Sequence, residues 1–211
     1  MTPEAAPAST EVTLLTLRAP RRTLVDRLAA WVSRLTHPPI VALIAVVVAS
    51  GVAAKGWLWG IGYLALAVFV PTAYVLFQLA RGRVHDVQLS VREERLKPYL
   101  LTVVCMVVSF AALQYAQAPR TLRQLALANA VQFSLLLLIT LRWKISAHGA
   151  SMGGMAAMLH ALFGVGALPF WVLVPLVGWS RVHLRRHDLL QVAAGAALGM
   201  SVVWFTFSHI T

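Results

Sequence analysis

The sequence predicts an all-α protein: a polytopic transmembrane helix bundle with six to seven spans, preceded by an amphipathic helix at the membrane interface. Composition points to the membrane in two ways. Of the 211 residues, 59% are hydrophobic and only 12% are charged, whereas an ordinary soluble domain carries about 25% charged residues, and the mean hydropathy is +0.76. The third observation is length: the apolar residues gather in runs that approach the roughly 20 residues needed to cross a bilayer as a helix.

Two segments precede the predicted transmembrane domain of residues 37–211. Residues 1–17 are rich in Pro, Ala and small polar residues, and we expect them to be disordered. In residues 18–36, apolar side chains recur at helical spacing and arginines fill positions between them, which is typical of a helix lying in the headgroup plane. The apolar positions are Leu24, Leu28, Trp31, Val32 and Leu35.

Five apolar runs each predict one transmembrane helix. They are residues 40–54, 57–80, 99–116, 122–141 and 188–210. A further run, 151–179, is too long for one upright span, and Gly164, Gly166 and Pro169 interrupt it in the middle. Because clusters of Gly and Pro mark turns, we expect two short helices in a hairpin there, which brings the count to seven.

The hairpin decides whether two polar clusters in the second half of the chain can meet. With two helices in 151–179, His148 and His187 return to the same membrane face, whereas a single span would separate them. The basic loop 81–98 falls on that face as well, because two predicted spans lie between it and His148. We call this the site face.

Basic residues are distributed unevenly between the two faces. Of the 18 Lys and Arg residues, only Lys55, Arg120 and Arg123 belong to the face opposite the site face. The positive-inside rule therefore predicts a multi-pass protein of the cell membrane with the site face in the cytoplasm. The net charge of +11 favours contact with anionic lipid, and we expect no nucleic-acid partner, since no segment resembles a nucleic-acid-binding module.

The two polar clusters carry the groups of a phosphate site. The first is Ile-Ser-Ala-His at 145–148, and the second is Ser180-Arg181 followed by His187. Ionisable residues close to a bilayer are costly, so their default interpretation is functional. Two histidines beside Lys144 and Arg181 are the groups needed for phosphoryl transfer through a histidine nucleophile.

These residues resemble the motifs of the type 2 phosphatidic acid phosphatase superfamily, which includes the vanadium haloperoxidases. The family's third motif is Ser-Arg, five residues, His, three residues and Asp; here Ser180-Arg181 and His187 match, and Gln191 occupies the last position. The second motif, Pro-Ser-Gly-His, compares with 145–148. The first motif, Lys, six residues and Arg-Pro, is absent in strict form, and the basic loop 81–98 stands in its place. The resemblance covers roughly residues 81–200.

The resemblance implies a membrane lipid phosphatase that needs no metal and no cofactor. His187 would attack phosphorus and form a phosphohistidine, and His148 would protonate the leaving alcohol as general acid. The partners would be a phosphorylated lipid and the membrane; the sequence carries no signal for the oligomeric state. The phosphate would be held by Arg181, Lys144, Arg92, Arg95 and Ser146.

Gln191 departs from the family pattern. On a helix it lies one turn after His187 on the same face, so its carbonyl can accept the Nδ1–H of the imidazole but brings no negative charge. Two alternative functions stay open. One is transfer of a phospho-head group to an alcohol on the same scaffold, and the other is a catalytically inactive protein that binds or transports lipid.

Overall fold

The computed structural model describes residues 23–209, and within that range the chain forms helices and no strand, which confirms the all-α prediction. Residues 1–17, predicted to be disordered, and the start of the predicted interfacial helix lie outside the described range. In chain order the helices are α1 (Leu24–Leu35), α2 (Pro38–Val52), α3 (Gly56–Leu64), η1 (Ala65–Phe69), α4 (Val70–Ala80), η2 (Glu93–Arg95), α5 (Leu96–Tyr115), α6 (Arg120–Thr140), α7 (Ala147–Phe163), η3 (Gly164–Val172), α8 (Leu173–His183) and α9 (Leu189–His209).

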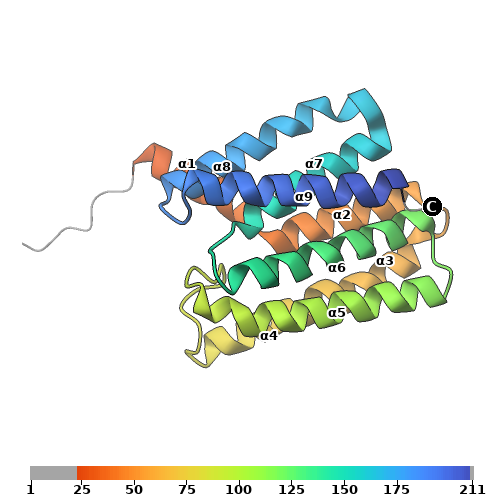
Figure 1. Cartoon of the computed structure of the whole chain (residues 1–211), viewed down its shortest axis with the longest axis horizontal. Coiled ribbons are helices and arrows are strands. Elements are labelled where there is room, and N and C mark those ends of the chain that lie inside the picture. Colours follow the sequence, from red (N-terminus) through yellow and green to blue (C-terminus); the bar gives the residue numbers. More distant parts are fainter. Residues whose placement is uncertain (1–22, 210–211) are drawn as a thin grey trace, which may run out of the picture.

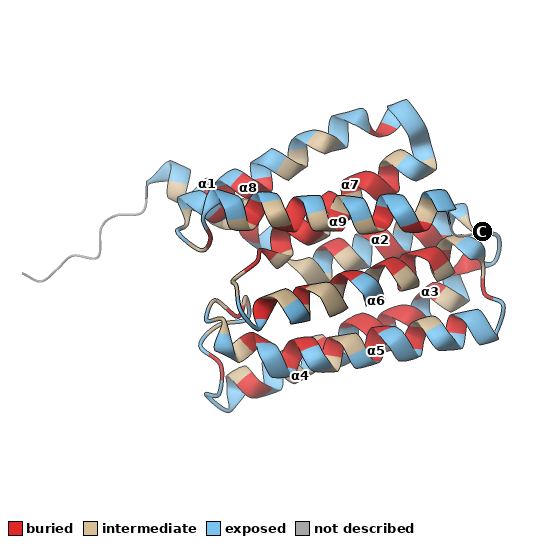
Figure 2. Ribbon diagram, in the orientation of Figure 1, coloured by how far each residue is buried: buried red, intermediate tan, exposed pale blue. Residues whose placement is uncertain are grey.

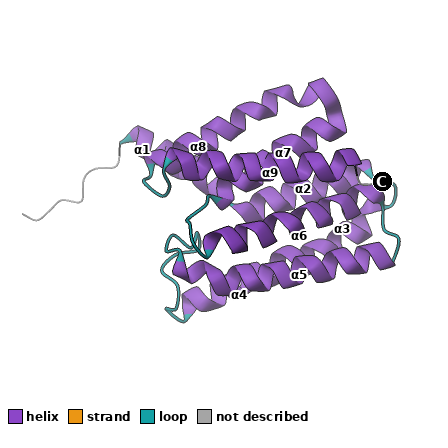
Figure 3. Cartoon of the chain, in the orientation of Figure 1, coloured by secondary structure: helices purple, strands orange, loops and turns teal. Residues whose placement is uncertain are grey.

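The long helices run up and down in one bundle, and the connections gather at its two ends (Figures 1 and 3). Helix α1, the long loop between α4 and α5, and the α6–α7 and α8–α9 connections share one end. The α2–α3, α5–α6 and α7–α8 connections share the other. The two ends correspond to the two faces predicted from the spans, and the polar clusters lie at the end that carries α1.

Within residues 23–209, five helical segments are long and apolar enough to cross a membrane, and a sixth is added when α1 and α2, which meet at a bend of 51°, are taken as one broken span. Large apolar side chains cover the outward faces of the long helices, where Figure 2 shows exposed residues along the bundle. Examples are Leu100, Val104, Val107, Trp204 and Phe205. Soluble proteins rarely expose an apolar surface of this extent, so the chain is a membrane protein.

The predicted hairpin in 151–179 is present. The chain reverses after α7 at Gly164, whose φ of +59° lies in the left-handed region that glycine adopts without strain. Helix α8 then returns alongside α7 towards α1 (Figure 1). By length and composition, Ala147–His183 counts as one candidate span, so the described residues contain five or six candidate spans. The prediction of seven spans counted the two arms of this hairpin separately.

Helices α7 and α9 form the closest helix pair, and small residues make this approach possible. A Cβ on Gly149 would lie 2.7 Å from the carbonyl oxygen of Val192, and one on Gly153 would lie 3.0 Å from the Cα of Ala196. Gly149 and Gly153 therefore allow the close packing of these two helices. The contact fixes the start of α7 against the start of α9, where the two polar clusters lie.

A wide helical turn interrupts the second long segment. Pro71 has no N–H to donate, and the preceding turn, Ala65–Phe69, widens to π geometry, in which the Val70 N–H bonds to the Ala65 carbonyl. Such single wide turns often occur at functional sites. Here Ala67, Val68 and Pro71 all face the cavity described next.

Candidate functional site

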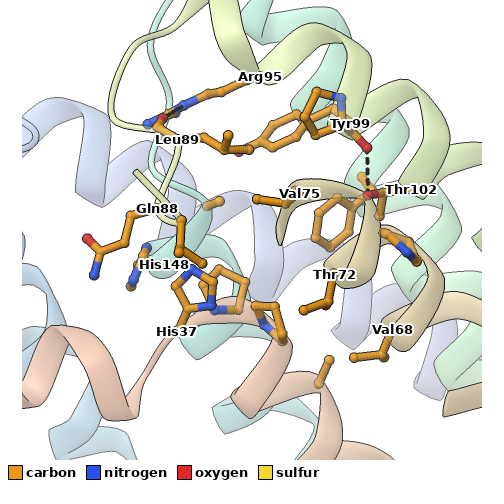
Figure 4. Close-up of a pocket in the computed structure, with 18 of the residues that line it drawn as sticks. His37, Val68, Thr72, Val75, Gln88, Leu89, Arg95, Tyr99, Thr102 and His148 are labelled. Atoms are coloured by element: carbon orange, nitrogen blue, oxygen red, sulfur yellow. Dashed lines mark hydrogen bonds between the residues drawn. The ribbon is translucent and has the colours of Figure 1, made fainter. Parts of the chain in front are cut away.

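A cavity of about 110 Å³ opens inside the bundle at the end that carries α1. Its polar wall is formed by His37, Gln88, Arg95, His148 and His187, and the remaining wall is almost entirely apolar. Figure 4 shows His37 and His148 side by side with Gln88 next to them, and Arg95 on the other side of the cavity. The space is several times the minimum needed for a water molecule, so a small charged group fits at the polar end.

His187, predicted as the nucleophile, lies in the α8–α9 connection and is 6% exposed. Its Nδ1 donates to the Oε1 of Gln191 over 2.8 Å, the contact expected from their spacing. With Nδ1 protonated, Nε2 carries the free lone pair. Burial lowers the pKa of His187 to about 3, and the positive charges of Arg95 and Arg181 act in the same direction. The imidazole is therefore neutral at neutral pH.

Helix α9 presents Gln191 to His187 through two further contacts. The Gln191 N–H donates to Asp188 Oδ1 at 2.8 Å, which caps the start of the helix. The Gln191 carbonyl accepts the Ser146 N–H at 3.2 Å. The backbone of Gln191 thus joins α9 to the start of α7, while its side chain holds His187.

His148, predicted as the general acid, is the second residue of α7 and is buried. Its Nε2 lies 3.2 Å from the carbonyl oxygen of Ser33 in α1, and because a carbonyl only accepts, Nε2 carries the hydrogen. The ring of His37 meets that of His148 edge to face, with 5.5 Å between centroids. His148 is thus held by α1 on one side and by the start of α2 on the other.

Arg181 and Arg95 are both almost fully buried, at 1% and 2% exposure. The Nη1 of Arg181 donates to Ser33 Oγ at 2.6 Å and to Gln88 Oε1 at 2.7 Å, and its Nε is buried without a hydrogen-bond partner within residues 23–209. Arg95 donates to the carbonyl oxygens of Leu89 and Ile145.

Neither arginine forms an ion pair with any acidic side chain in the described part of the chain. Each is held by neutral oxygens instead. Buried charges are normally paired, so two buried guanidinium groups without a carboxylate are a strong indication of an anion site. Arg95 lines the cavity directly, whereas Arg181 lies behind Ser33 and Gln88.

The other predicted phosphate ligands are placed differently. Lys144 is half-buried in the α6–α7 loop; burial lowers its pKa, and the charges of Arg95 and Arg181 lower it further. Arg92 instead points outward and pairs with Glu93 at 3.1 Å, so it does not line the cavity. Between the two arginines predicted from the loop, the structure brings only Arg95 to the site.

Ser146 serves a structural purpose in this arrangement. Its hydroxyl accepts the Gly149 N–H at 3.2 Å and caps α7, and the residue is completely buried. The hydroxyl therefore stabilises the helix start that carries His148 and does not face the cavity.

Sequence reasoning missed Ser33, His37 and Gln88. His37 could have been noticed, because it stands immediately before Pro38 and the first span, at a span end like His148. Ser33 and Gln88 are uncharged residues in a helix and a loop, and their types carry no comparable signal.

Within residues 23–209, no group of three or more His, Cys, Asp or Glu side chains could hold a metal ion. Comparison of the chain with protein-family models, curated proteins and solved structures gives no match. The functional interpretation therefore depends on the geometry of the site.

Proposed function

We propose that the protein is an integral membrane lipid phosphatase that hydrolyses a phosphomonoester or diphosphate head group through a phosphohistidine intermediate. One observation carries the proposal. Two histidines with complementary ring nitrogens, His187 and His148, line one buried cavity beside Arg95 and Arg181, neither of which forms an ion pair with a described carboxylate. A phosphate would supply the missing negative charge.

In the first half of the reaction, Nε2 of His187 attacks phosphorus and the bond from phosphorus to the lipid oxygen breaks. The low pKa of His187, about 3, keeps the lone pair available at neutral pH. His148, protonated on both ring nitrogens when the negatively charged phosphate is bound, donates its Nδ1 proton to the departing alcohol oxygen. The Ser33 carbonyl holds Nε2–H of His148, which leaves Nδ1 to exchange that proton.

In the second half, water attacks the phosphohistidine while His148 takes the proton from that water. The N–P bond breaks, inorganic phosphate leaves and His187 returns to its neutral form. Arg95 and Arg181 stabilise the charge on the equatorial oxygens, because guanidinium groups bind phosphate in a fixed, forked geometry, and Lys144 adds a positive point charge. The entering phosphate replaces the Gln88 amide oxygen, which occupies Arg181 from the cavity side in the structure.

The rest of the cavity supports a lipid as the substrate. Beyond the polar wall, the lining consists of apolar side chains from α2, η1, α5 and α6, among them Val68, Met106 and Phe133. A head group at the histidines would place the first part of a hydrocarbon chain among these residues, where burial of each CH₂ contributes about 0.8 kcal/mol. Phosphatidate and polyprenyl phosphates both have this amphiphilic form. The basic residues at this end of the bundle support a site on the cytoplasmic side of the cell membrane.

The test is release of inorganic phosphate from a panel of lipid phosphates by the purified protein in detergent. His187→Ala should abolish release, and rapid quenching of the wild-type reaction should trap phosphate on His187. His160→Ala is the matched control, because His160 lies on α7 among Trp171 and Trp204 and away from the cavity.

The same assay distinguishes the alternatives. Transfer of phosphate to an added alcohol would identify a transferase. Phosphate binding without turnover of any lipid would identify a lipid-binding protein on this scaffold. Full activity of His187→Ala would refute the phosphohistidine mechanism.

A further inference from the structure

Helix α1 lies outside the stretch that resembles the phosphatase family, yet its inner strip contacts the centre of the site. Only Ala29 and Ser33 of α1 are buried. The carbonyl of Ala29 accepts the Ser180 hydroxyl at 2.7 Å. Ser33 makes three contacts: its hydroxyl accepts from Arg181 Nη1 and, at 3.5 Å, from Gln88 Nε2, and its carbonyl accepts from His148.

Polar contacts hold α1 on the bundle. Besides the Ser33 contacts, Asp26 Oδ1 lies 2.8 Å from Nε2 of His183 at the end of α8. The large apolar side chains of α1 point outward instead: Leu24 is 81% exposed and Trp31 is 59% exposed. Val32 packs against the buried cluster of Val41, Met152 and Val177, but the other large apolar side chains of α1 are exposed. The polar contacts of α1 run to His148, Ser180, Arg181 and His183.

Ser33 and Gln88 hold the same nitrogen of Arg181 and also contact each other, but only Gln88 reaches the cavity wall. Gln88 belongs to the α4–α5 loop and lines the cavity. Ser33 lies on the buried side of α1, is 1% exposed and does not line the cavity. An anion that enters the cavity meets Gln88 first and leaves the Ser33 contact in place.

We propose that Ser33 is a positioning residue and that α1 is an integral part of the phosphate site. Ser33 fixes the guanidinium of Arg181 from behind and fixes the tautomer of His148 through its carbonyl. This inference rests on the proposed function, since it assigns the role to the same phosphate site. Gln88 is the acceptor that phosphate replaces, so the two acceptors of Arg181 differ in purpose.

The experiment measures binding of inorganic phosphate through the thermal stabilisation that it gives the purified full chain. Ser33→Ala removes the hydroxyl and keeps the carbonyl that contacts His148. It should weaken phosphate binding about tenfold, which corresponds to one hydrogen bond to a charged group. Gln88→Ala should not weaken binding, because phosphate displaces this side chain.

Two further variants separate positioning from a general loss of structure. Ser109→Ala is the matched control, because Ser109 is also buried but bonds to the Cys105 carbonyl within α5; it should leave phosphate binding unchanged. In an Arg181→Lys background, Ser33→Ala should have little further effect, because Ser33 acts through the guanidinium.

Each contrary result is decisive. Unchanged or tighter phosphate binding by Ser33→Ala would overturn the positioning role, and tighter binding would mean that Ser33 competes with the anion. Equal weakening by Ser33→Ala and Gln88→Ala, or additivity with Arg181→Lys, would overturn it too. If phosphate does not stabilise the wild-type protein, the proposed function fails and this inference fails with it; if phosphate stabilises the wild type and Ser33→Ala equally, only the inference is refuted.

Discussion

A single isosteric substitution, Gln191→Glu, tests the electrostatics of the site. It keeps the length of the side chain whose Oε1 accepts from His187 Nδ1 at 2.8 Å, and it adds the negative charge that the resembled family carries at this position. At about 4 Å between charge centres and an effective dielectric constant of about 20, the attraction to a protonated imidazole is about 4 kcal/mol. This energy corresponds to a rise in the pKa of His187 from about 3 to about 6.

The pKa is measured by NMR titration of the protein with isotopically labelled histidine, with the His187 signal assigned from its loss in His187→Gln. In the activity assay, the acidic limb of the kcat/KM profile should move to higher pH by the same amount. The reason is that the protonated imidazole has no lone pair for the attack on phosphorus.

Gln191→Leu is the control, because it removes the acceptor without adding a charge, and it should leave the pKa of His187 low. A pKa that stays below about 4 in Gln191→Glu would refute the reasoning, since the carboxylate then fails to interact with the ring at the distance seen in the structure.

Three other outcomes are expected. The folded-state pKa of His187 lies below its unfolded value of 6.5, so the unfolded chain binds more protons between these two values. The free energy of unfolding should therefore fall by on the order of 5 kcal/mol as the pH drops from 6.5 to 3. His187→Gln should remove this part of the pH dependence in denaturation curves. Gly153→Ala should lower stability by about 1–3 kcal/mol because its new methyl group meets the backbone of α9, whereas Gly62→Ala, which has nothing within 4 Å of the new methyl group, should be neutral or stabilising in the same thermal melts. Arg95→Met should abolish phosphate release and cost about 2–3 kcal/mol by leaving two buried carbonyls unpaired. Arg92→Met, at a half-buried position away from the cavity, should stay within about 0.5 kcal/mol and keep full activity.

The spans could be predicted because the thickness of the bilayer fixes the length of an apolar helix. The predicted limits of the five simple spans lie within three residues of the helices observed. The hairpin after α7 was equally accessible, because Gly164 and Pro169 interrupt a run that is too long for one helix. In both cases the signal is local in sequence and rests on one physical constraint.

The composition of the site was accessible only in part. The spacing of His187 and Gln191 predicts their hydrogen bond, since both lie within one helical turn. The choice between Arg92 and Arg95 was not predictable, because it depends on the helical phase with which the loop enters α5. Both arginines have the same charge, and three residues of rotation separate a surface ion pair from a buried position.

The contribution of α1 was hidden for a different reason. An amphipathic pattern identifies the side of a helix that avoids water, and in α1 this is the strip containing Leu24, Leu28 and Trp31. The opposite strip is neutral and small, and nothing in Ala29 or Ser33 indicates which element will cover it. Its partner, Arg181, lies 148 residues further along the chain, beyond the reach of any local pattern.

That separation has a consequence for biosynthesis. At about 5–20 residues per second, a ribosome needs roughly 7–30 seconds to travel from Ser33 to Arg181. During this time the residues of α7 and α8 that contact α1 have not yet been synthesised. The capping box between Thr23 and Asp26 can stabilise α1 as a helix, and its exposed apolar strip can bind the membrane surface. The outward-facing Leu and Trp side chains would then keep α1 beside the membrane until α8 and α9 have inserted.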